Sequence, residues 1–209
     1  MTDDEHDLDG AYALRTPADS VRYYRDWAAS YDSDFAEAMS YQSPAVIAAA
    51  YVALGGQGPV LDVGAGTGLV GESLAEAGIG PVDGLDISAE MLETAAEKGV
   101  YRRTIVGDLT RELALGDAAY AGCVSAGTFT TGHVGPEAFD ELLRVTRPGG
   151  IFAVTVHGVF YETAGFAAHF AGLADRIAGF RTEPFRIYGP GAEGEHRDDS
   201  GWVVSFRKS

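Results

Sequence analysis

The amino-acid sequence predicts an α/β protein whose core is a seven-stranded, mostly parallel β-sheet with helices on both faces. Two observations support this prediction. First, short apolar runs of strand length alternate with longer segments in which apolar residues recur at helical spacing. Second, a glycine-rich turn joins the first apolar run directly to a helical segment, as in sheets whose parallel strands are connected through helices.

The N-terminal part of the chain has helical but no strand patterning. Residues 1–16 are acidic and lack periodicity, so we expect a loose tail there. Residues 17–56 read as helices. Ser43 followed by Pro44 is typical of a helix start, because serine caps the helix and proline suits its first turn. We therefore predict a flexible tail, an N-terminal helical unit over 17–56 and one larger domain over 57–209.

From residue 57 on, strand and helix signals alternate up to the C-terminus. Right-handed crossovers bring the carboxyl ends of parallel strands to one edge of the sheet, where ligands bind in folds of this kind. The expected strands are 60–63, 82–87, 104–106, 120–125, 151–156, 185–188 and 202–206, and the helices begin near 69 and cover 88–98, 136–144 and 161–178.

The charge balance restricts the class of binding partner. The chain has 15 Lys and Arg against 31 Asp and Glu, a net charge of −16, and only two of its cations are lysines. A protein that holds nucleic acid or an anionic membrane needs clustered cations, so we expect neither partner and expect a small molecule instead. No apolar stretch reaches membrane-spanning length and no leader pattern opens the chain, so a cytoplasmic protein is expected. The single Cys123 excludes an internal disulfide and a cysteine-rich zinc site, and no metal site is expected.

The strongest local feature is the segment VLDVGAGTG at residues 60–68. Alternating glycines permit left-handed backbone conformations and let a ligand approach the main chain, and the following helix offers unpaired N–H groups. One register, Gly66-x-Gly68-x-x-Gly71, matches the dinucleotide fingerprint, with Asp86 about 20 residues further on. This register leaves a nicotinamide-dependent oxidoreductase as one interpretation.

A second register starts from the acid before the glycines, Asp62-x-Gly64-x-Gly66-x-Gly68. A carboxylate at this place does not favour a pyrophosphate. It suits a cofactor that carries ammonium and sulfonium groups, because opposite charges attract. This register therefore favours a cationic cofactor.

Three segments together carry a family resemblance. VLDVGAGTG, followed by GLDIS at 84–88 and VGD at 106–108, resembles the motif set of class I S-adenosylmethionine-dependent methyltransferases. The resemblance covers roughly residues 58–157. Residues 31–51 are also similar to the N-terminal part of methyltransferases related to the Williams-Beuren-region methyltransferase.

This resemblance implies a Rossmann-like fold in which the N-terminal helices form a lid over S-adenosylmethionine, with S-adenosylhomocysteine as the product. It implies that Asp86 binds the ribose hydroxyls and that Ile87 packs on the adenine. Met91 either covers the adenine or packs in the helix core. Asp108 either binds the adenine edge or belongs to a turn. The aromatic residues of the lid either contact the cofactor or pack the helices together. The residues expected at the cofactor are Tyr24, Trp27, Tyr31, Asp62, Gly64, Ala65, Gly66, Gly68, Asp86, Ile87, Met91, Asp108, Leu109 and Ser125.

The acceptor side is expected after the fourth strand, at residues 123–134. Enzymes of this kind that methylate amino groups of DNA and protein often carry Asn/Asp-Pro-Pro-Tyr there, but this chain has no asparagine. His133 follows the strand in a loop rich in threonine and glycine. Imidazole accepts a proton near pH 7, so His133 is the candidate catalytic base, and a surface loop histidine is the alternative. We therefore expect methyl transfer to a small molecule, with an NAD-dependent oxidoreductase or a non-catalytic cofactor-binding protein as alternatives.

Overall fold

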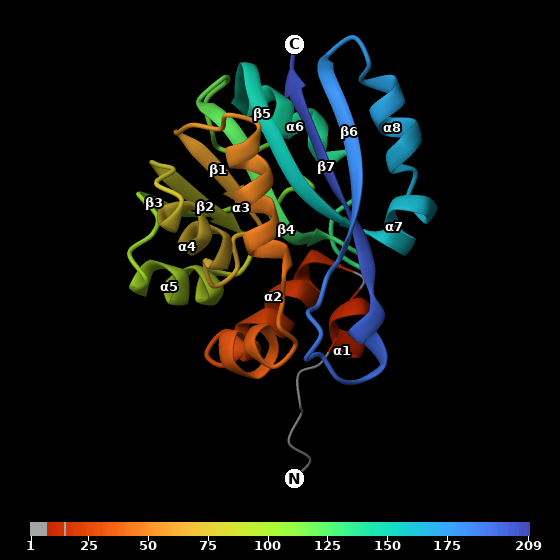
Figure 1. Cartoon of the computed structure of the whole chain (residues 1–209). Helices are drawn as coiled ribbons and strands as arrows, with labels where there is room; N and C mark the ends of the chain where they lie inside the picture. Colours follow the sequence, from red (N-terminus) through yellow and green to blue (C-terminus); the bar gives the residue numbers. More distant parts are fainter. Residues whose placement is uncertain (1–7, 15) are drawn as a thin grey trace.

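The computed structural model describes residues 8–14 and 16–209 and contains a seven-stranded sheet (Figure 1). The strand order is β3-β2-β1-β4-β5-β7-β6, and every neighbouring pair is parallel except the pairs that β7 makes with β5 and β6. This arrangement confirms the predicted α/β fold. The strands are β1 (Val60–Val63), β2 (Val82–Asp86), β3 (Arg103–Val106), β4 (Tyr120–Phe129), β5 (Thr146–His157), β6 (Ile177–Arg186) and β7 (Ser200–Lys208).

Two helices begin at residues whose side chains cap them, but the cap expected at Ser43 is wrong, because Ser43 is already the first residue of its helix and the preceding Gln42 makes no side-chain cap hydrogen bond. The Thr16 side chain accepts a hydrogen bond from the Asp19 N–H at the start of α2, and the Ser88 side chain accepts one from the Met91 N–H at the start of α5. The helical segments are α1 (Leu8–Tyr12), α2 (Pro17–Trp27), the π-helical η1 (Tyr31–Glu37), α3 (Ser43–Ala53), α4 (Leu69–Glu76), α5 (Ala89–Glu97), α6 (Ala138–Val145), α7 (Gly158–Thr163), α8 (Phe166–Gly172) and the short 3₁₀ turn η2 (Glu195–Asp198).

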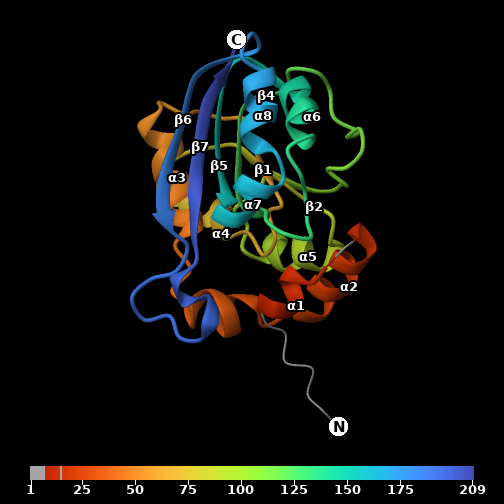
Figure 2. The ribbon, with the colours of Figure 1, turned by 90° about the vertical axis from the view of Figure 1, so that its right-hand side faces the viewer.

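Both faces of the sheet are covered by apolar packing. On one face, Tyr51 of α3 and Leu74 of α4 are fully buried against residues of the central strands. On the other face, α6 and α8 contribute Phe139 and Phe170 to a second cluster, which contains Phe152 of β5. Figure 2 shows α3 on one side of the sheet and α6 and α8 on the other. These two layers hold the strand ends that build the site in fixed positions.

The prediction for the segment after β5 was wrong in detail. We expected one helix over 161–178, but Gly165 adopts a left-handed conformation that separates α7 from α8, and α8 ends at Gly172. Residues from Ile177 onward form β6, which pairs with β7 as an antiparallel hairpin. The alanine-rich composition favours a helix locally, but pairing along a whole neighbouring strand outweighs such a preference.

The N-terminal helices lie at the carboxyl edge of the parallel strands, where Figure 1 shows α1 and α2 below the sheet. They share a small aromatic cluster with the segment after β6, centred on Trp27, Phe35 and Tyr188. The expected loose tail over 1–16 is wrong for α1, because Ala11 is only 2% exposed and packs in this cluster. Burial of these apolar side chains orders the segment. The other acidic residues of that prediction, 1–7, lie outside the described part of the chain.

Candidate active site

The glycine loop after β1 is shaped by three left-handed residues. Gly64, Gly66 and Gly68 have φ angles of 66°, 53° and 95°, a region that residues with a Cβ rarely adopt. A Cβ on Gly64 would lie 1.9 Å from Oγ1 of Thr128, whereas a Cβ on Gly66 would meet no atom within 4 Å. Gly64 therefore permits close packing against β4, and Gly66 leaves open space at the ligand side of the loop.

Asp86 holds this loop against the end of β2. Its Oδ2 accepts a hydrogen bond of 2.8 Å from the Gly66 N–H, and its Oδ1 accepts one of 2.9 Å from the Ser88 N–H. Burial raises the pKa of Asp86, and the N–H donors oppose this rise. A carboxylate has about four acceptor positions, so Asp86 retains capacity for further donors.

A cavity opens between the glycine loop, the ends of β2 and β4, and the N-terminal helices. Thr67, Tyr41 and Thr128 line it together with most of the residues expected from the sequence. The expected residues in its wall are Tyr24, Tyr31, Gly64, Ala65, Gly66, Asp86, Ile87, Met91, Asp108, Leu109 and His133.

Four residues expected at the cofactor lie outside the wall of this cavity. Gly68 is the N-cap residue of α4, and Trp27 is buried in the aromatic cluster of the N-terminal helices. Ser125 is buried and donates a hydrogen bond of 2.6 Å to the Val63 carbonyl. Asp62 is fully buried beneath the loop. These four residues pack beneath the residues that line the cavity.

Several lining residues were not among the expected ones. Thr67 lies inside the glycine loop 60–68, and residues 126–128 lie inside the expected acceptor segment 123–134, so their positions in the sequence could have predicted their place in the cavity wall. Tyr41 also lies inside such a segment, 31–51, whereas Ser20 carries no such signal. They reach the cavity only because the N-terminal helices fold back over the sheet edge.

The buried Asp62 is paired on one side only. Its Oδ2 accepts a 2.5 Å hydrogen bond from the Tyr101 hydroxyl, and its Oδ1 has no hydrogen-bond partner among the described residues. The Tyr101 ring fits here because Gly71 and Gly84 lack side chains, since a Cβ on either would lie within 3 Å of the ring. Burial raises the pKa of Asp62 to about 7, the Tyr101 hydrogen bond opposes this rise and the charge of Asp86 adds to it.

We expect Asp62 to make stability depend on pH. Because its pKa in the folded protein exceeds the ordinary value of 3.8, the folded state binds more protons than the unfolded state between these values. Stability from this group is therefore full below about pH 4 and is lost as the pH rises to about 7, by on the order of a few kcal/mol. Asp62→Asn should flatten that slope in chemical denaturation measured from pH 4 to 8.

Asp175→Asn serves as the matched control, because it makes the same change at an exposed carboxylate between α8 and β6. It should keep the wild-type slope. If Asp62→Asn kept that slope as well, Asp62 would not be the group that titrates.

A polar network ties η1 to the glycine loop. The Thr67 hydroxyl donates a 2.5 Å hydrogen bond to Oδ1 of Asp32, and the Lys98 ammonium donates to Oδ2 of Asp32 at 2.6 Å and to Oε2 of Glu72 at 2.7 Å. Burial opposes the charge of Lys98, but the hydrogen bonds with the two carboxylates outweigh it and raise the Lys98 pKa. Asp32 is thus the contact through which η1, the loop and α5 are connected.

Asp32→Asn should loosen η1 from the loop. Loss of a charge-assisted hydrogen bond of this kind costs about 1 kcal/mol, because the groups are partly exposed. We expect roughly three- to ten-fold weaker binding of a ligand in the cavity and faster proteolysis within residues 28–42. Glu72→Gln is the control, since it weakens the interaction of Lys98 with residue 72 but leaves the hydrogen bond between Thr67 and Asp32. Equal effects of both variants would show that Asp32 has no special role.

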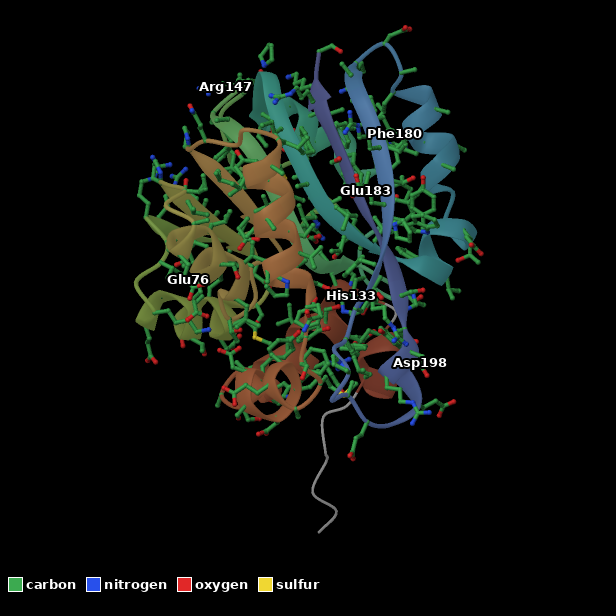
Figure 3. All side chains as sticks on the ribbon, in the orientation of Figure 1. Glu76, His133, Arg147, Phe180, Glu183 and Asp198 are labelled. Atoms are coloured by element: carbon green, nitrogen blue, oxygen red, sulfur yellow. The ribbon has the colours of Figure 1, made fainter. Side chains whose placement is uncertain are left out.

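His133 and Tyr24 form a hydrogen-bonded pair in the cavity wall, with His133 between the N-terminal helices and the sheet (Figure 3). Nδ1 of His133 lies 3.0 Å from the Thr131 carbonyl oxygen, so Nδ1 carries the hydrogen and donates. Nε2 is then the acceptor and lies 3.0 Å from the Tyr24 hydroxyl, which donates to it. Burial lowers the pKa of His133, and the hydrogen bond with Thr131 opposes this. The pair places an unprotonated imidazole nitrogen at the cavity.

Comparison with known proteins matches residues 60–150 to a family model described as a methyltransferase domain. Human methyltransferase-like protein 27 is 32% identical over 151 residues, which are 69% of this chain and 60% of that protein. The 18S rRNA (guanine-N(7))-methyltransferase RID2 of Arabidopsis thaliana is 42% identical over 66 residues, 32% of this chain and 22% of that protein. The Haloferax volcanii chain solved in complex with the Trm112 methyltransferase activator has a TM-score of 0.62 and 20% identity, covering 89% of this chain and 98% of that chain.

The sheet order and the glycine loop closed by Asp86 define a Rossmann-like, cofactor-binding protein. With the matched domain and its relatives, residues 60–150 form a methyltransferase domain similar to those of class I S-adenosylmethionine-dependent methyltransferases, whose cofactor is S-adenosylmethionine. The chain spans 60% of the length of the human relative.

The comparisons do not support the expectation that nucleic acid is no partner, because one relative is named as an rRNA methyltransferase. No helix in the described part of the chain is long and apolar enough to cross a membrane.

Proposed function

We propose that this protein transfers the methyl group of S-adenosylmethionine to a small-molecule acceptor. The observation that carries the proposal is the single cavity in which the glycine loop and Asp86 lie at one side and the His133–Tyr24 pair lies at another. A cofactor site and a proton acceptor that share one cavity are the two parts that methyl transfer to an O–H or N–H group needs.

The space, the hydrogen-bond acceptors and the apolar surface of the cavity wall suit S-adenosylmethionine. A Cβ on Gly66 would stand in open space, so the loop leaves room for a ligand against the main chain. Asp86 retains acceptor capacity for ribose hydroxyls, and Ile87, Met91 and Leu109 offer apolar surface to the adenine. Oδ1 of Asp108 accepts hydrogen bonds from the Thr110 N–H and hydroxyl and Oδ2 faces Arg111, and the remaining acceptor capacity of this carboxylate suits an exocyclic amino group.

The bound cofactor supplies an activated methyl group, since its sulfur–methyl bond breaks with the electron pair passing to sulfur as the acceptor bonds to the methyl. The proton that the acceptor loses passes to the Tyr24 hydroxyl oxygen as the Tyr24 proton passes to Nε2 of His133, because Nδ1 is held by Thr131 and the one lone pair of Nε2 faces Tyr24. Tyr24 orients the imidazole through its hydroxyl. The N-terminal helices cover the cavity and exclude water, and Asp32 ties η1 to the loop.

A small acceptor is favoured over nucleic acid by the charges around the site. No lysine or arginine lies in the cavity wall formed by the described residues. Lys98 is engaged by two carboxylates, and Lys208 donates to the carbonyls of Leu143 and Thr146. With 31 Asp and Glu against 15 Lys and Arg, the net charge of −16 disfavours binding to the phosphates of a nucleic acid.

The test is calorimetric titration with S-adenosylmethionine and S-adenosylhomocysteine, with NADH as a parallel titrant. We expect both methionine-derived ligands to bind and NADH not to bind. Incubation of a metabolite extract and of total RNA with a methyl-labelled donor, followed by mass spectrometry, should then place the label on a small molecule. Binding of NADH alone would establish the oxidoreductase alternative, binding without any labelled product the non-catalytic one, and labelled RNA a nucleic-acid acceptor.

A further inference from the structure

A second cavity adjoins the cofactor cavity at the carboxyl ends of β4 and β5. The two cavities share Tyr24, Tyr31, Tyr41, Gly127 and His133 in their walls. The His133–Tyr24 pair therefore lies at the boundary between them. A molecule in the second cavity would be next to both the candidate base and the cofactor.

The walls of the second cavity are mainly aromatic. Rings from the N-terminal helices, Trp27 and Phe35, and from the segment after β6, Tyr188, surround it. Neighbouring rings lie 5.5 Å apart for Trp27 and Phe35 and 6.0 Å apart for Phe35 and Tyr188. Tilted and edge-on arrangements at these distances are the ones that aromatic rings prefer, so another ring can join them.

The described wall contains no lysine, arginine, aspartate or glutamate. Its titratable groups are tyrosines and the two histidines His133 and His157. Burial is the main cause that raises the pKa of the tyrosines, that of Tyr41 to about 12, so they stay neutral. An anion in this cavity would lose its hydration without meeting a cation.

Two lining residues have buried polar atoms without a hydrogen-bond partner among the described residues. These atoms are Oγ1 of Thr130 and Nδ1 of His157. Buried polar atoms in proteins are normally satisfied, so unpaired ones beside a cavity point to a ligand that brings polar groups of its own.

Resting on the function proposed above, we propose that the second cavity binds the methyl acceptor and that this acceptor is an aromatic hydroxy compound without an anionic group. The aromatic wall holds the ring, and the hydroxyl donates to the hydroxyl oxygen of Tyr24, which itself donates to Nε2 of His133. A carboxylate or a phosphate on the acceptor is disfavoured because no cation faces it.

Three phenols of one shape but different charge test this proposal. Tyrosol is neutral, tyramine is cationic and 4-hydroxyphenylacetate is anionic, and each is titrated calorimetrically into the protein saturated with S-adenosylhomocysteine. We expect tyrosol to bind at least ten-fold more tightly than the acid, and tyramine to bind more tightly than the acid as well, because the faces of aromatic rings attract a cation. Equal or tighter binding of the acid, or no binding of any phenol to a protein that binds S-adenosylhomocysteine, would overturn the proposal. The second result would leave the proposed cofactor binding intact.

Filling the cavity tests its location. Ala11 of α1 lies in the wall of the second cavity and not in that of the first, so Ala11→Phe should weaken tyrosol binding at least ten-fold and leave S-adenosylhomocysteine binding unchanged. Ala13→Phe is the matched control, because Ala13 is exposed just beyond α1. Thr130→Val preserves side-chain shape and should weaken tyrosol binding several-fold even if Ala11→Phe does not fold. Unchanged tyrosol affinity in Thr130→Val, and in any Ala11→Phe that folds, would overturn the proposal.

Discussion

His133→Gln is expected to slow methyl transfer by about 10²- to 10⁴-fold, the usual contribution of a positioned general base. The amide oxygen of glutamine can still accept the Tyr24 hydrogen bond but cannot take the proton of the acceptor. Binding of S-adenosylhomocysteine should stay within a factor of two to three, because Asp86 and the glycine loop are unchanged. Single-turnover rates with the labelled acceptor, compared with calorimetry, separate the two effects.

The pH profile of methyl transfer by this protein should carry the signature of the same group. Burial lowers the pKa of His133 below its ordinary value of 6.5, so the unprotonated form prevails at pH 7. The rate should fall as the pH drops through that lowered pKa and should level off above about pH 7. His169→Gln, on α8 beside Asp140, is the control and should keep the wild-type rate and profile. A wild-type rate in His133→Gln would exclude His133 as the base.

Gly64→Ala is expected to destabilise the protein by about 2–5 kcal/mol and to abolish cofactor binding. The added Cβ would lie 1.9 Å from Oγ1 of Thr128, and the residue would also be held at a φ of 66°. Left-handed backbone costs an L-residue about 1–2 kcal/mol, and forcing extra volume into packed surroundings costs about 1–3 kcal/mol. Chemical denaturation measures the stability, and titration with S-adenosylhomocysteine measures the binding.

Gly66→Ala separates the two parts of this effect. Its φ is 53°, but the new methyl group would meet no protein atom within 4 Å. We expect only the conformational cost of about 1–2 kcal/mol, together with a large loss of cofactor affinity, because Gly66 lies in the wall of the cavity. If Gly64→Ala were no less stable than Gly66→Ala, the contact with Thr128 would not be what requires a glycine at position 64.

Local sequence patterns were sufficient to predict the glycine loop and the position of Asp86 beside it. The strand before Gly64 and the placement of Asp86 at the end of the next strand depend on short segments, and β1 and β2 lie side by side in parallel register. The sequence pointed to Asp86 as a ligand residue. It did not show that the same carboxylate also accepts the Gly66 N–H, because that contact depends on how two loops meet.

Helix and strand assignment failed where local preference and pairing disagree. The alanine-rich stretch before residue 178 favours a helix, yet its end belongs to β6, because β7 offers a partner strand along its whole length. The same kind of long-range packing turned part of the expected tail into α1, through the burial of Ala11.

The sequence by itself determined the α/β fold class, the glycine loop, the family resemblance and the histidine that follows β4. These features depend on spacing within a few residues, which sets backbone conformation and strand ends. Only the tertiary structure decided that His133 faces Tyr24, that Asp32 reaches Thr67 and that α1 and Tyr188 close a second cavity. Those contacts join segments that are 35 to more than 100 residues apart in the chain. They form because the sheet brings its carboxyl ends together and the N-terminal helices bury their aromatic faces over that edge.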